Sequence, residues 1–253
     1  MPVIKVSDES GDTMTLLEVN GHYLPVLRIP GYNQEKEVRS MELWEARPDD
    51  ILLCAYPKSG THWIWEAVCM LFNGKAERIQ SMKEIAMLEG SSKMAFDKLA
   101  SPRILNTHLL YQQLPSDFKS KKCKLIYLLR NPKDVAVSFY NHHIKLKDYE
   151  YTGSWDHYLD RFMNGKVDYG SWFDYVLHWE QQLSRNTDTT HIIDPLREVK
   201  RLCEFLEKDI ELQVLQDIVH LCDFNKMKKD KDPLEDLDEW KDQQPGMYRK
   251  GKE

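Results

Sequence analysis

Residues 51–63 read ILLCAYPKSGTHW, and this stretch decides how the chain folds. Its first five residues are all apolar, which is typical of a parallel strand buried on both faces. A tight loop with Lys58, two hydroxyl side chains and Gly60 follows, and then a helix begins. Free amides at a helix N-terminus and the helix dipole favour an anion, and Lys58 adds a full positive charge. The stretch therefore predicts a strand, a loop and a helix that together bind an anion.

Two other interpretations of this loop are open. It differs from the Walker A motif of P-loop kinases, G-x-x-x-x-G-K-[ST], because Lys58 precedes Gly60. The chain also lacks a clear Mg²⁺-binding aspartate, so a kinase is disfavoured. A simple strand-to-helix turn with incidental polar residues would show the same letters KSGT. The choice depends on which other side chains meet the loop.

The composition is ordinary for a soluble globular protein. The chain has 253 residues, of which 42% are hydrophobic and 30% charged, and it shows no repeat or linker, so we expect a single domain over residues 1–253. A net charge of -6 argues against general nucleic-acid binding, so an anionic ligand needs a local basic cluster. The five cysteines show no C-x-x-C spacing, which predicts free thiols. Without a signal peptide or a membrane-length apolar run, we expect a cytoplasmic protein with no membrane partner.

The strand pattern places three polar side chains at one edge of a sheet. Residues 103–107 and 124–129 read as further strands, and amphipathic helices alternate with them. This pattern predicts an α/β fold with a mainly parallel central sheet flanked by helices. Ligands bind such sheets at the carboxyl ends of the strands. Lys58, His108 and Arg130 each follow a predicted strand, so we expect them to converge.

Arg130 and Ser138 are candidates to bind a second phosphate. The guanidinium fork of an arginine matches phosphate oxygens, and Pro132 suits the first turn of the helix that carries Ser138. A capped helix with an Arg–Asp surface pair is the alternative for this segment. His108 is a candidate base for an acceptor hydroxyl, with a packed structural histidine as its alternative. His142 and His143 are expected near the mouth of the same pocket.

In this order the motifs resemble the cytosolic sulfotransferase family over nearly the whole chain. Members transfer a sulfuryl group from 3'-phosphoadenosine 5'-phosphosulfate (PAPS) to small hydroxyl or amine acceptors and release 3'-phosphoadenosine 5'-phosphate (PAP). Residues 56–63 resemble the 5'-phosphosulfate loop, and residues 107–109 (THL) resemble the catalytic histidine segment. Residues 129–138 (LRNPKDVAVS) resemble the 3'-phosphate segment, and residues 249–251 (RKG) resemble a second 3'-phosphate clamp. Residues 169–172 (YGSW) resemble a mid-chain helix start, and Phe224 and Met227 match residues that pack against the adenine.

The resemblance implies an in-line displacement without a metal. Lys58 is then expected to neutralise the leaving phosphate, and His108 to take the acceptor proton. The implied PAPS-binding residues are Lys58, Ser59, Gly60, Thr61 and His62 in the loop, Trp63, Phe224 and Met227 at the adenine, and Arg130, Ser138, Arg249, Lys250 and Gly251 at the 3'-phosphate. The implied partner is a small-molecule acceptor, phenolic or alcoholic.

The sequence departs from the family pattern in three places. Many members have a lysine two residues before the histidine, whereas this chain has Asn106, whose amide can hydrogen-bond a sulfuryl oxygen but brings no charge. A Tyr-Glu-Asp segment is missing before Asp194. The sequence ends at Glu253 without the family's dimerisation motif, which predicts a monomer. These departures leave an alternative function open, that of a PAPS- or PAP-binding protein with weak or no catalysis.

Overall fold

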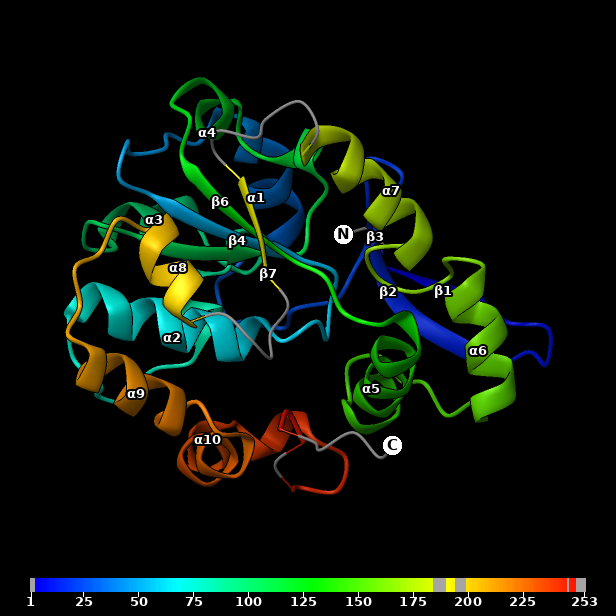
Figure 1. Ribbon diagram of the computed structural model, residues 1–253. Helices are drawn as coiled ribbons and strands as arrows, with labels where there is room; N and C mark the ends of the chain where they lie inside the picture. Colours follow the sequence, from blue (N-terminus) through cyan, green and yellow to red (C-terminus); the bar gives the residue numbers. More distant parts are fainter. Residues whose placement is uncertain (1–2, 184–189, 194–198, 245, 249–253) are drawn as a thin grey trace.

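The protein is built around a parallel sheet of four strands, which confirms the predicted parallel central sheet (Figure 1). This computed structural model describes residues 3–183, 190–193, 199–244 and 246–248. The strands of the sheet are β4 (Ile51–Ala55), β5 (Ile104–Thr107), β6 (Lys124–Leu128) and β7 (Thr190–Ile193). Their order is β5-β4-β6-β7, and every neighbouring pair is parallel. The carboxyl ends of β4, β5 and β6 therefore lie at one edge, next to Lys58, His108 and Arg130.

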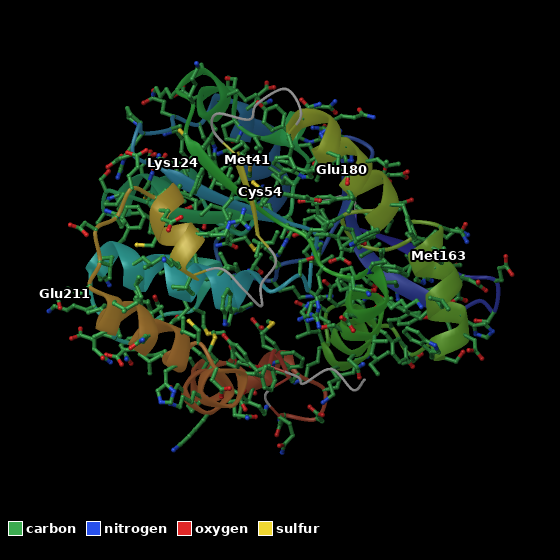
Figure 2. All side chains as sticks on the ribbon, in the orientation of Figure 1. Met41, Cys54, Lys124, Met163, Glu180 and Glu211 are labelled. Carbon is green, nitrogen blue, oxygen red and sulfur yellow. The ribbon has the colours of Figure 1, made fainter. Side chains whose placement is uncertain are left out.

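The sheet is buried on both faces because alternate residues of each strand point to opposite sides. Ile51, Leu53 and Ala55 pack with one apolar cluster, whereas Leu52 and Cys54 pack with another. The first cluster includes residues of α2 (Thr61–Asn73), α8 (Val199–Phe205) and α9 (Leu212–Leu221). The second includes residues of α3 (Lys93–Lys98), α4 (Ser116–Ser120), α5 (Pro132–Lys145), α6 (Trp155–Met163) and α7 (Trp172–Leu183). In Figure 2, Cys54 lies near the centre of the molecule and Glu211 at its periphery.

A smaller antiparallel sheet precedes the central one in the chain. It consists of β1 (Val3–Ser7), β2 (Thr13–Val19) and β3 (His22–Leu24), in the order β1-β2-β3. The remaining elements are α1 (Gln34–Ser40), α10 (Phe224–Lys231) and the 3-10 turns η1 (Met41–Leu43), η2 (Lys83–Ala86), η3 (Leu88–Gly90), η4 (Tyr111–Gln113), η5 (Asp232–Leu234) and η6 (Leu237–Glu239). All five cysteines are buried and unpaired, as expected. Among the helices in the described part of the chain, none has the length and apolar content that a bilayer crossing requires.

A network of buried charges fixes α10 against α2. The ammonium of Lys231 lies 2.8 Å from the carboxylate of Glu66 and donates to the carbonyl of Ile79 at 2.6 Å. Arg78 approaches Glu66 at 3.5 Å and Asp230 at 2.9 Å. Paired charges of this kind are tolerated in a protein interior because each has a partner. The network holds the C-terminal end of α10 beside Glu66 of α2.

A second buried ion pair fixes the amino ends of β4 and β5. Arg103 binds Asp50 with two hydrogen bonds of 2.7 and 2.5 Å, and both side chains are at most 1% exposed. Replacing Arg103 with methionine is expected to lower the free energy of unfolding by about 3–5 kcal/mol, because the Asp50 carboxylate is left buried without a countercharge. Urea denaturation measures this loss. Lys5→Met, which breaks an exposed pair with Glu150, is the control and is expected to cost less than about 1 kcal/mol. An equal loss in the two variants would contradict the prediction.

Candidate active site

The predicted anion loop turns sharply between β4 and α2. Lys58 and Gly60 both have left-handed backbone conformations, with φ of 65° and 102°. The helix begins at Thr61 directly after Gly60, so its first amides face the loop. Ser59 is 1% exposed, and its hydroxyl has no hydrogen-bond partner among the residues that the structure describes. A buried hydroxyl without a partner carries an energetic cost, which a bound anion at this loop would relieve.

The Lys58 ammonium points across the sheet edge toward α5 and the C-terminal segment. Its Nζ lies 3.4 Å from Nδ1 of His142 and 3.3 Å from Sδ of Met247. Burial, followed by the nearby charge of Lys83, lowers the pKa of Lys58 from 10.5 to about 8. Neither of these two neighbours is a carboxylate, so the ammonium contacts neutral groups. A bound anion would therefore stabilise its charged form.

Arg130 joins the end of β6 to the anion loop. Its Nη1 donates to the backbone carbonyl of Lys58 at 2.7 Å. The alternative of a surface pair between Arg130 and an aspartate is therefore not the arrangement found among the described residues. Asn131 caps α5 by accepting from the amide of Lys133, and Pro132 occupies the first turn as predicted. Ser138 lies half-buried two turns into the same helix. The predicted convergence of Lys58 and Arg130 is thus confirmed.

His108 is buried and held in one tautomer. Its Nδ1 lies 2.7 Å from the carbonyl oxygen of Ala55, the last residue of β4. A carbonyl only accepts hydrogen bonds, so Nδ1 carries the proton and Nε2 carries the lone pair. Burial, with a contribution from Lys83, lowers the pKa of His108 from 6.5 to about 3. The imidazole is therefore neutral and has the base nitrogen that proton transfer requires.

Glu89 positions the histidine segment, a role that the sequence did not reveal. Its carboxylate accepts from the amide of His108 and from the hydroxyl of Thr107, both at 2.7 Å. The ring of Tyr169 packs against His108 with a centroid separation of 5.3 Å. Tyr169 precedes α7, which begins at Trp172, so the predicted helix start is confirmed. Backbone and ring of His108 are thereby fixed from two sides.

A second lysine, which is buried, lies at this site, and sequence reasoning missed it. Lys83 belongs to η2, is 4% exposed, and donates to Oδ1 of Asn106 at 3.1 Å. It also pairs with Glu84 at 3.2 Å, and Glu84 in turn lies 3.2 Å from Nε2 of His62. Burial lowers the pKa of His62, so its imidazole is neutral. The sequence signal was Asn106 at a position where many family members have a lysine. That signal did not indicate which other residue would lie next to position 106.

The residues expected to contact the adenine lie near the first turn of α2. Nε1 of Trp63 donates to the carbonyl of Cys222 at 2.7 Å, immediately before α10. Phe224 is half-buried on that helix and Met227 is 2% exposed. The rings of His62 and Tyr248 pack at a centroid distance of 5.5 Å on the same side. The predicted residues Arg249, Lys250 and Gly251 lie outside the described residues, as does the predicted deletion site before Asp194.

The expectation for the paired histidines is half correct. His142 approaches Lys58, as the sequence predicted for a residue near the pocket. His143 does not, because its Nε2 binds Asp168 at 2.7 Å and its Nδ1 lies 2.9 Å from the hydroxyl of Tyr158, all in the interior. Adjacent residues on a helix point about 100° apart, so only one of the two faces the loop.

Comparison with known proteins identifies the family. The family model described as "Sulfotransferase domain" matches residues 48–252. The chain belongs to the sulfotransferase family. It is 37% identical to sulfotransferase 1B1 of Canis lupus familiaris over 223 residues, covering 82% of this chain and 74% of that protein. It is therefore a member of the PAPS-dependent sulfotransferases, as the motifs predicted.

Solved structures of sulfotransferases and related proteins share this fold. Mouse sulfotransferase SULT7A1, crystallised with PAP, is 30% identical and superposes with a TM-score of 0.70, covering 84% of this chain and 76% of that one. Retinol dehydratase in complex with retinol and PAP superposes with a TM-score of 0.74 over 99% of this chain and 83% of that one. At 17% identity, the second likeness concerns the fold alone.

Proposed function

We propose that this sulfotransferase moves a sulfuryl group from PAPS to the hydroxyl or amine of a small, phenolic or alcoholic, acceptor. One observation carries the proposal. A neutral histidine with an unprotonated Nε2 is fixed by a 2.7 Å hydrogen bond to Ala55, the last residue of β4, which lies three residues before Lys58 in the chain. A base and a cation at one strand end are what transfer of a charged group to a hydroxyl requires.

The residues around the loop fit the donor. The unpartnered hydroxyl of Ser59 and the amides of Gly60 and Thr61, with His62 beside them, would hold the 5'-phosphate. Arg130 and Ser138 would hold the 3'-phosphate, for which a guanidinium is well suited. The rings of Trp63 and Phe224 and the side chain of Met227 supply apolar surface for adenine. Arg249, Lys250 and Gly251 remain proposed 3'-phosphate ligands on the basis of sequence.

The reaction follows from these positions as an in-line displacement. The acceptor oxygen attacks the sulfur while its proton passes to Nε2 of His108. The bond between the sulfur and the bridging oxygen breaks, and its electron pair remains on the phosphate of the leaving PAP. Lys58 neutralises the charge that develops on that oxygen. The groups that stabilise bond formation and bond cleavage are therefore in place before the reaction begins.

Two measurements on the intact chain test this function. Calorimetry is expected to show PAP binding that does not depend on Mg²⁺, and labelled PAPS with a panel of phenols and alcohols is expected to give a labelled product. Binding without transfer to any acceptor would favour the weakly catalytic alternative. Binding of ATP that strengthens with Mg²⁺ would favour a kinase instead. Absence of PAP binding would overturn the proposed donor.

A further inference from the structure

Lys83 is placed where a charge would act on the sulfuryl group. Asn106 lies on β5, which ends at Thr107, and His108 follows directly after it. Side chains two residues apart project to the same side of an extended chain. Lys83 donates to Oδ1 of Asn106 at 3.1 Å, and its charge contributes to lowering the pKa values of both Lys58 and His108. The ammonium therefore lies among the groups that surround the reacting atoms.

The side chain of Asn106 holds Lys83 in place. Its Oδ1 accepts from the lysine ammonium, and its Nδ2 donates to the lysine backbone carbonyl at 2.8 Å. The expectation that the Asn106 amide itself binds a sulfuryl oxygen is thus replaced by a different arrangement, in which both polar atoms of the amide hold Lys83. Asn106 is fully buried and the lysine is 4% exposed, so the pair is protected from solvent.

The ammonium retains capacity for a ligand. An ammonium has three N–H donors. Among the residues that the structure describes, two polar partners of Lys83 Nζ are found, Asn106 at 3.1 Å and Glu84 at 3.2 Å. Glu84 is shared with His62, so its carboxylate is not devoted to the lysine. One N–H therefore remains for an anion inside a site that burial makes strongly responsive to charge.

From this geometry we infer that Lys83 is a catalytic residue whose ammonium, held by Asn106, binds the sulfuryl oxygens during transfer. The inference rests on the proposed function. It assigns a residue of η2, distant in sequence from every recognised motif, to the centre of the reaction. It also explains how a chain with asparagine at position 106 places a second cation there, in addition to Lys58. PAP lacks the sulfuryl group, so Lys83 is expected to matter for turnover and not for PAP affinity.

The test compares Lys83→Met with the wild-type chain in transfer from PAPS and in PAP binding. Turnover is expected to fall about 100-fold, the usual loss when one preorganised charge-stabilising donor is removed. PAP affinity is expected to change by less than about threefold. Adding Asn106→Lys to Lys83→Met should return turnover to at least about one tenth of wild type, since a lysine at position 106 reaches the vacated volume. Lys124→Met, which removes a lysine at the opposite, amino end of β6, is the control and should leave turnover unchanged.

A spectroscopic readout separates catalysis from support of the fold. NMR titration of the His108 imidazole should show a higher pKa in Lys83→Met than in wild type, because a neighbouring positive charge has gone. Lys83→Gln, which retains a hydrogen-bond donor without charge, should lose turnover like the methionine variant. Wild-type turnover in Lys83→Met, or equal losses of turnover and PAP affinity, would overturn the inference while leaving the proposed function intact. A wild-type chain that binds PAP but transfers nothing would overturn both.

Discussion

Replacing His108 with alanine is expected to lower turnover by about 1,000-fold while PAP affinity stays within about threefold of wild type. The imidazole is bound through Nδ1 to Ala55 at 2.7 Å, so removing it eliminates the proposed base and leaves the loop between β4 and α2 in place. The backbone amide of residue 108 still donates to Glu89, which preserves the course of the chain. Single-turnover transfer from labelled PAPS and calorimetry with PAP measure the two quantities.

A control variant tests whether the effect of His108→Ala is specific to that histidine. His22→Ala removes an exposed histidine at the start of β3 and is expected to change neither turnover nor affinity. The far-ultraviolet circular dichroism spectrum of His108→Ala should match that of wild type. Turnover equal to wild type in His108→Ala would remove this histidine from its proposed role and leave its alternative as a packed structural residue.

The pH profile of the wild-type chain should reflect the same histidine. Its pKa is lowered to about 3, so Nε2 keeps its lone pair from neutral pH down through pH 5. An unperturbed histidine base would instead lose activity as the pH fell through 6.5. We therefore expect kcat/KM to show no decline between pH 7 and pH 5.5. A half-maximal point near pH 6.5 would contradict the burial of His108.

The sequence predicted the parallel sheet and one edge of the site because those features depend on local patterns. An apolar run before KSGT defines β4, and Gly60 allows the φ of 102° from which α2 begins. Parallel strands bring their carboxyl ends together, so placing Lys58 and Arg130 side by side needed only the strand assignments. The acceptor to which Arg130 donates, the carbonyl of Lys58, follows from the same geometry.

Lys83 and Glu89 escaped prediction because tertiary structure alone brings them to the site. Both lie in short 3-10 turns with no periodicity, and the segment between the turns runs beside β5 through a bridge from Met87 to Asn106. Nothing in the local sequence indicates that this irregular segment lies along the edge of the central sheet. Charged residues in such segments are commonly solvated, and only their burial, 4% and 0% exposed, reveals a different role.

Lys58→Met is expected to have a comparably large effect, but on two quantities together. Turnover should fall about 1,000-fold, because the charge that develops on the leaving phosphate loses its nearest cation. PAP affinity should fall about tenfold at pH 7, because PAP retains the phosphate that Lys58 is proposed to bind. Calorimetry and transfer assays measure both, with Lys124→Met as the control. A loss of turnover with unchanged PAP affinity would place Lys58 elsewhere than at the phosphate.

The pH dependence of PAP binding identifies the ammonium itself. Because the pKa of Lys58 is lowered to about 8, the charged form dominates below pH 8 and is lost as the pH rises through that value. Wild-type affinity is therefore expected to be highest below pH 8 and to weaken above it, with proton uptake on binding between pH 8 and 9. Lys58→Arg keeps its charge in this range and should abolish the weakening, since a guanidinium stays protonated. The same decline in Lys58→Arg would mean that another group titrates, and Lys58 would then lose its assignment as the cation that receives the leaving phosphate.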